Sequence, residues 1–127
     1  DDENGKDIAD LEDHKLIVAS DDEVFQVVEQ APEYPGGMVA LMKWNGKEIK
    51  YPSIAPEMNI EGKVIVQFVI GRDGAVRDVQ VLRSVDPTLD KEAVRVVKAM
   101  RKWIPGRQRG EPVSVRFTLP ITFKLQQ

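Results

Sequence analysis

The chain has 127 residues and a mass of 14.3 kDa, which is the size of one domain. It contains no cysteine and one histidine, His14, which excludes disulfides, thiol catalysis and multi-histidine metal sites. No run of 18 apolar residues occurs and no charged-then-apolar leader opens the sequence, so we expect any signal or anchor to have been cut away.

Charge is distributed unevenly along the chain. Residues 1–23 hold ten acids and two lysines, a net charge of −8, whereas residues 24–127 carry +5. The first segment also lacks a sustained apolar period. This contrast predicts an acidic flexible linker over residues 1–23 and one folded domain over residues 24–127.

The start of the folded part has only short elements. Residues 24–28 are β-prone but brief, and the prolines and glycines of residues 32–37 then break regular structure. Met38, Leu41 and Met42 have helical spacing and predict a short helix over residues 38–44. Pro52 suits the first turn of a second short helix through about Met58.

Two strands and a helix follow. Residues 63–70 are rich in Val, Ile and Phe and predict a strand, residues 71–74 a turn, and residues 75–83 the returning strand. Asp86 and Asp90 are both suitable caps for the next helix. The apolar stripe of this helix predicts that it runs to about Lys102. The stripe consists of Leu89, Ala93, Val96, Val97 and Met100.

The C-terminal part contains the clearest pattern. Residues 107–110 read as a loop, and apolar residues then alternate with others from Val113 to Leu125, which predicts a long strand with one buried face. The elements together predict an α+β fold, with a three-stranded antiparallel sheet of order 2-1-3 packed against one long helix and one or two short N-terminal helices. This order places the last strand at an edge, where Pro120 is tolerated.

The residues exclude most enzyme chemistry. The single histidine, His14, lies in the acidic segment, so a Ser-His-Asp triad is not expected, and no phosphate-binding glycine motif occurs. We therefore expect no enzyme, no catalytic residue, no metal and no cofactor. A basic cluster from Lys98 to Arg116 surrounds Trp103, but a net charge of +5 is small for a nucleic-acid-binding domain. We expect Trp103 to be buried and no nucleic acid to bind.

An ordered set of short motifs resembles the C-terminal domain of TonB energy transducers, in a variant close to that of Bacteroidetes. The resemblance covers about residues 24–125. Its motifs are the stretches 34–37, 49–52 and 62–64, Phe68, Asp73-Gly74, residues 89–93, residues 103–106, and Leu119-Pro120-Ile121 with Phe123. Lys50 stands where the family commonly has Gln, and Arg101 stands where this branch usually has Pro.

The resemblance implies a periplasmic domain of a protein anchored in the inner membrane by an N-terminal helix that is missing here. It implies that the proton-powered ExbB–ExbD complex drives the protein. It also implies that the domain binds the TonB box of outer-membrane transporters during nutrient uptake. This binding is strand addition to the edge of the last strand. A homodimer is a further assembly compatible with such an edge.

The partner-binding residues implied by this binding lie in two segments. They are Lys50, Tyr51, Pro52, Val113, Ser114, Val115, Arg116, Phe117, Thr118, Leu119, Ile121, Thr122 and Phe123. Strand addition derives its affinity from main-chain hydrogen bonds, which suits varied partner sequences.

Two alternatives stay open. The β-prone residues 24–28 are themselves a candidate for pairing with a sheet edge, where they would compete with the partner or support a dimer. Similar domains also occur in membrane-bound signalling proteins, so the runner-up function is a TonB-like sensor or scaffold domain.

Overall fold

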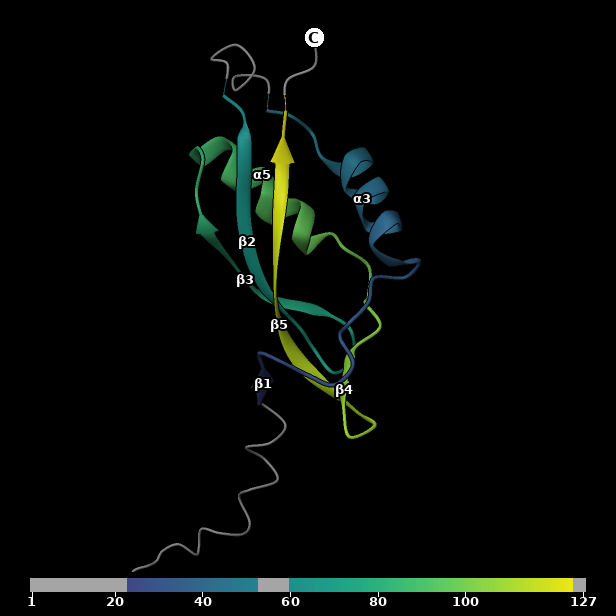
Figure 1. Ribbon diagram of the computed structural model, residues 1–127. Coiled ribbons are helices and arrows are strands. Elements are labelled where there is room, and N and C mark those ends of the chain that lie inside the picture. Colours follow the sequence, from purple (N-terminus) through teal and green to yellow (C-terminus); the bar gives the residue numbers. More distant parts are fainter. Residues whose placement is uncertain (1–22, 53–59, 125–127) are drawn as a thin grey trace, which may run out of the picture.

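The computed structural model describes residues 23–52 and 60–124. Its elements, in chain order, are β1 (Val24–Phe25), α3 (Gly37–Glu48), β2 (Gly62–Ile70), β3 (Val76–Arg83), α5 (Pro87–Lys98), β4 (Gly106–Gln108) and β5 (Glu111–Phe123). Figure 1 shows α5 behind the sheet and α3 beside it, so both helices leave the front face of the sheet uncovered.

The sheet is built around the two longest strands. β2 pairs antiparallel with β5 over nine residues, from Gly62 opposite Phe123 to Ile70 opposite Val115. β3 pairs antiparallel with the other side of β2, and β1 pairs parallel with the other side of β5. The path across the sheet is therefore β1-β5-β2-β3, while β4 pairs with β5 off this path.

The predicted sheet of three antiparallel strands was wrong in strand count and direction. The sheet has five strands and is mixed, because β1 runs parallel to β5. The residues predicted as a loop form β4 and a tight turn, in which Arg109 and Gly110 both have positive φ angles. Such angles are typical of a two-residue hairpin turn, and the sequence Arg-Gly is a weak signal for one.

α5 packs one face against the sheet. Asp86 caps the helix, because its side chain accepts a hydrogen bond from the Thr88 nitrogen at 3.0 Å. The helix ends at Lys98, four residues before the predicted end near Lys102. Beyond this point the chain is no longer helical, and Trp103 is buried in the core. The backbone nitrogen of Trp103 donates to the Gly74 carbonyl at 2.9 Å.

The core lies between α5 and the rear face of the sheet. Apolar residues that alternate along β2 and β5 meet the buried stripe of α5, as predicted for both elements. Trp103 is buried, with 4% of its surface exposed. Its ring packs edge-on against Tyr34, with centroids 5.4 Å apart, and at a tilt of 58° against Phe117, with centroids 5.1 Å apart. The prediction that Trp103 belongs to the core is confirmed.

The N-terminal part differs in detail from the prediction. α3 spans Gly37–Glu48 and is longer than the predicted helix over residues 38–44. Only Leu41 and Asn45 of this helix are buried. Most of the predicted second short helix lies outside the described residues. Within the described part of the chain, no helix is long and apolar enough to cross a membrane.

Candidate partner-binding site

The outer side of β5, away from β2, is one of two long unpaired strand edges in the described sheet. On this side β1 pairs with Ser114 and Val115. In the described residues no strand pairs with this side from Arg116 to Phe123. An edge with free backbone donors and acceptors is a template for another strand.

The opposite edge of the sheet, on β3, is a poorer template. The pairing of β3 with β2 shifts register twice, and Asp78 in this strand has a φ angle of 52°. Bulges of this kind twist an edge away from a regular ladder, and the charged side chains of Arg77, Asp78 and Arg83 add to the effect. By contrast, β2 and β5 pair without a register shift.

The structure divides the predicted edge residues into two groups. Ser114 and Val115 are buried and already face β1, and Val113 lies opposite Gly106 of β4. Ser114 was predicted to be a non-core position, but it is only 2% exposed and lies opposite Val24 of β1. The second group has an unoccupied outer side and consists of Arg116, Phe117, Thr118, Leu119, Ile121, Thr122 and Phe123.

Alternation is clean only in this second group. Leu119, Ile121 and Phe123 are buried, while the intervening Thr118, Pro120 and Thr122 are exposed. Proline is tolerated where its nitrogen faces away from the ladder. Because backbone direction alternates along a strand, we expect the nitrogens of Thr118 and Thr122 to face outward like that of Pro120.

The segment of residues 50–52 is held in place by a charged cluster between the two helices. The Lys50 nitrogen donates to Glu92 Oε2 at 2.7 Å. Arg95 donates to both carboxylate oxygens of Glu92 at 2.8 Å, and to Glu48 Oε2 and the Glu48 carbonyl at 2.9 Å. Arg95 therefore joins the end of α3 to α5, and Glu92 fixes the start of the 50–52 segment.

The cluster also alters the protonation of its members. Hydrogen bonds from Arg95, assisted by the Lys50 nitrogen, hold the pKa of Glu92 below its usual range. The same bonds raise the pKa of Arg95. Both effects favour the charged forms, so the cluster is an ion pair at neutral pH.

Tyr51 connects this segment to the far end of β5. Its ring meets Phe123 edge-on, with centroids 5.7 Å apart and planes at 81°. Its hydroxyl donates to the Ile60 carbonyl, and burial raises its pKa, with a further contribution from Glu61. The two predicted partner-binding segments are therefore adjacent at this end of the strand.

A hollow of about 450 Å³ lies beside the 50–52 segment, on the helix side of the molecule. Its walls come from that segment and from α5, including Thr88, Lys91 and Glu92. Among the described residues, no group of three or more histidine, cysteine, aspartate or glutamate side chains could hold a metal ion.

Several residues of the site were not predicted. The β-prone character of residues 24–28 indicated that this segment could pair with a sheet edge. Nothing in the sequence indicated that Val24 and Phe25 would pair parallel to β5, or in which register. Glu92 and Arg95 have the spacing of a helical ion pair. Their bonds to Glu48 and Lys50 join residues more than 40 positions apart, and no local pattern predicts such bonds.

Comparisons with known proteins agree on one family. The family described as "Gram-negative bacterial TonB protein C-terminal" matches residues 47–125. The chain is 35% identical over 77 residues to a protein TonB of Pseudomonas aeruginosa, covering 61% of this chain and 22% of the relative. It is 36% identical over 78 residues to a protein TonB of Haemophilus influenzae, covering 61% and 28%.

A solved structure is similar as well. The solution structure of the TonB C-terminal domain of Helicobacter pylori covers 71% of this chain, and this chain covers 81% of that domain. The two share 25% sequence identity and a TM-score of 0.54. The chain spans about a quarter of the length of the curated relatives that it matches.

Proposed function

The chain belongs to the TonB C-terminal family, and from that premise we propose that it grips a short segment of an outer-membrane transporter. The grip is strand addition to the outer side of β5, from Arg116 to Phe123. Held there, the segment forms one more strand of the sheet, and a pull on the domain is passed to the transporter. The domain acts by binding and carries no enzyme activity.

The observation that carries this proposal is the regular, unpaired outer side of β5. A row of outward main-chain groups binds an extended segment whatever its side chains are. Several such bonds loaded together also resist a pull along the strand. The bulged edge of β3 lacks this regularity, which favours β5 as the docking strand.

Residues 50–52 supply a second contact near one end of the docked segment. Tyr51 packs against Phe123 and so lies where β5 ends. Lys50 is exposed, and its backbone is fixed by Glu92. A contact at this point gives the segment a defined end and adds selectivity to an otherwise sequence-tolerant ladder.

The remaining parts of the proposal concern the whole protein. We place the domain in the periplasm of a protein anchored in the inner membrane and driven by ExbB–ExbD. Residues 1–23 then form the end of a linker that leads to the folded domain over residues 24–127. The relatives that carry the name TonB favour a transducer over a sensor or scaffold.

An NMR titration tests the proposal. The labelled chain is titrated with TonB-box peptides from transporters of the same cell, and with a scrambled peptide as control. We expect shifts concentrated on residues 116–123 and 50–52 for the true peptides alone. Equal shifts with the scrambled peptide, or shifts confined to β3 or α3, would contradict it.

A further inference from the structure

The uncovered face of the sheet is positively charged. Register partners share a face, so Arg116, Val69 and Arg77 form one row across β5, β2 and β3, in which Val69 is buried and the two arginines are at least partly exposed. Pro120, Ile65 and Arg83 form another row, and Thr122 lies beside Lys63. Between them lies a neutral row in which Gln80 donates to Gln67 at 3.0 Å. We call Lys63, Arg77, Arg83 and Arg116 the cationic face.

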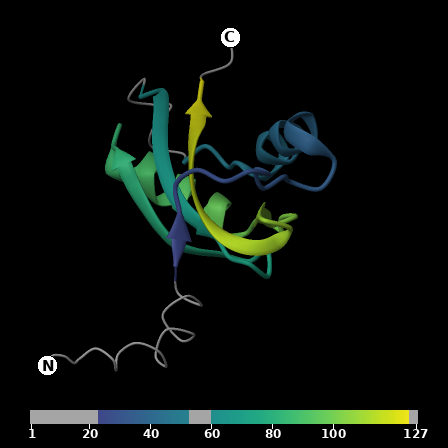
Figure 2. The same cartoon turned by 60° about the horizontal axis from the view of Figure 1, so that its bottom comes forward.

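Most of these cations have no acidic partner. Arg77 pairs with Asp78 at 2.6 Å on the exposed surface. Lys63, Arg83 and Arg116 form no ion pair with any residue in 23–52 or 60–124. Among the acids of the folded part, Asp78 is held by Arg77 on this surface, and Glu48 and Glu92 are neutralised by Arg95 between the helices. The cationic face is thus an unbalanced charge on a surface that neither helix covers (Figures 1 and 2).

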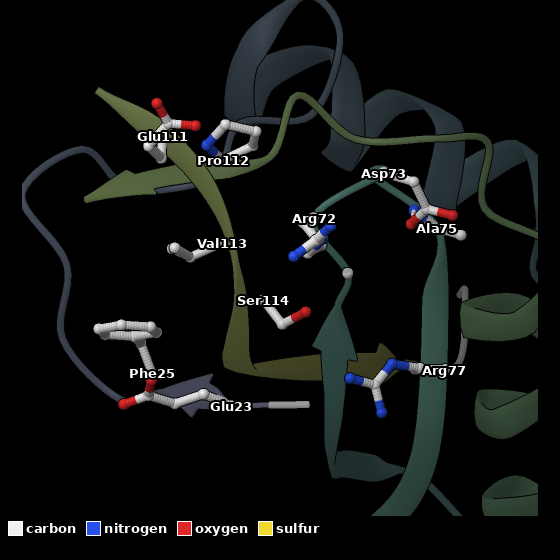
Figure 3. A pocket seen from close by; sticks show the side chains of 11 residues that line it. Glu23, Phe25, Arg72, Asp73, Ala75, Arg77, Glu111, Pro112, Val113 and Ser114 are labelled. Atoms are coloured by element: carbon white, nitrogen blue, oxygen red, sulfur yellow. Dashed lines mark hydrogen bonds between the residues drawn. The ribbon is translucent and has the colours of Figure 1, made fainter. Parts of the chain in front are cut away.

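The acidic segment joins the sheet beside this face. Val24 lies opposite Ser114, two residues before Arg116. Because β1 runs parallel to β5, the chain enters β1 from the Val113 side, so residues 1–22 must turn back to reach the cationic rows. Glu23 lines an open hollow of about 890 Å³ at this point. Figure 3 shows Glu23 and Phe25 on the β1 side of the hollow, and Arg72 and Arg77 on the side of β2 and β3. Asp73 and Glu111 also line the hollow, so the hollow itself carries no excess of positive charge, and the unpaired cations lie farther along the face at Lys63, Arg83 and Arg116.

The chain itself contains the complementary charge. Residues 1–22 include nine acids and two lysines, and Asp21 and Asp22 immediately precede Glu23. We propose that residues 1–22 fold back from β1 and lie across the cationic face, held by charge. The occupant is therefore a segment of this same chain, and the proposal does not depend on the function proposed above.

The geometry permits this arrangement. An extended segment of 22 residues reaches about 75 Å, whereas the seven residues of strand from Lys63 to Val69 span about 20 Å. A tether of this length holds the segment at an effective concentration in the millimolar range, so individually weak contacts suffice. The contacts are on the surface and act over a Debye length of about 10 Å at 0.1 M salt, so added salt should release the segment.

A spin label tests the proposal in the full chain. Because the chain has no cysteine, Asp10→Cys gives one site for a nitroxide. We expect the label to broaden the amide signals of Gln67, Thr118 and Gln80 at least about twofold more than those of α3 and α5, and about 0.5 M NaCl to abolish the difference. The broadening should not depend on protein concentration, as required of a contact within one chain.

A pair of charge variants identifies the face. Lys63→Glu with Arg83→Glu should remove the preferential broadening, while Lys43→Glu with Lys47→Glu, the same charge change on α3, should leave it intact. Dispersed amide spectra verify that each variant is folded. Equal broadening of both faces, broadening that survives high salt, or broadening centred on the exposed Met38 and Met42 of α3 would overturn the proposal.

Discussion

The backbone nitrogen of Lys50 donates to Glu92 Oε2 at 2.7 Å, and this one bond ties the segment between α3 and β2 to the middle of α5. Arg95 completes the connection by binding both Glu92 and Glu48. Only two residues of α3 are buried, and Trp44 packs against Tyr34, so these polar bonds add to a small apolar contact in attaching this helix and residues 50–52.

Loss of the Glu92 charge should loosen this attachment. Glu92→Gln keeps the shape of the side chain but removes charged hydrogen bonds, and we expect a loss of about 1–2 kcal/mol in the free energy of unfolding at pH 7, measured with urea. Glu111→Gln, an exposed position at the start of β5, is the control and should change stability by less than about 0.5 kcal/mol.

The same carboxylate predicts a pH dependence. The pKa of Glu92 is lowered in the folded chain, so its stabilising contribution is complete above the unfolded-state pKa of about 4.3. It is lost as the pH falls through the lower folded-state value. Between pH 7 and about pH 3 the native chain should therefore lose more stability than the Glu92→Gln variant. Parallel losses in the two chains would show that Glu92 does not carry this effect.

Gly74 should tolerate no side chain. Its φ angle is 88°, and a Cβ would lie 2.2 Å from the Trp103 carbonyl oxygen. We expect Gly74→Ala to cost more than about 2 kcal/mol, because both the backbone and Trp103 must shift. Gly110→Ala is the matched control: its φ is 79°, but nothing lies within 4 Å, so only the cost of about 1–2 kcal/mol for positive φ remains. Thermal unfolding of both variants checks the difference.

β1 should limit the length of the docked segment. Val24 and Phe25 occupy the outer side of β5 at Ser114 and Val115, so a partner strand that reaches those positions must displace β1. Phe25→Pro removes a donor from β1 and should release it. Peptides long enough to reach Ser114 should then bind about three- to tenfold more tightly, while shorter peptides keep their affinity. Calorimetry measures the affinity of a long and a short peptide for both chains. An equal change in affinity for the two peptides would show that β1 does not limit the length of the docked segment.

Periodic patterns predicted the parts of the fold that bury one continuous face. The stripe of α5 and the alternation of β5 both repeat over many residues, so their type and approximate bounds follow from the sequence. β1 contains only two residues, and its parallel pairing depends on where the chain crosses β5, so no pattern specifies it. The early end of α5 was missed for a related reason, because the bond from Trp103 to Gly74 joins residues 29 positions apart.

The candidate site, too, was predicted in part from the sequence and in part found only in the structure. The predicted strand order 2-1-3, with Pro120 in agreement, placed the last strand at an edge. The sequence did not predict that β1 pairs with Ser114 and Val115 of this strand. Residues 50–52 were named through a resemblance between sequences. The structure adds the physical link, namely the contact of Tyr51 with Phe123 and the bond from Lys50 to Glu92.

Strand addition at β5 is tested most directly by removing one backbone donor on the outer side of this strand. Thr118→Pro removes that donor at an exposed position and should leave the fold intact, whereas Thr118→Ala changes the side chain and keeps the donor. We predict that the affinity for a TonB-box peptide, measured by calorimetry, falls about tenfold in Thr118→Pro and stays within about twofold in Thr118→Ala. Equal affinities in the two folded variants would contradict strand addition at β5.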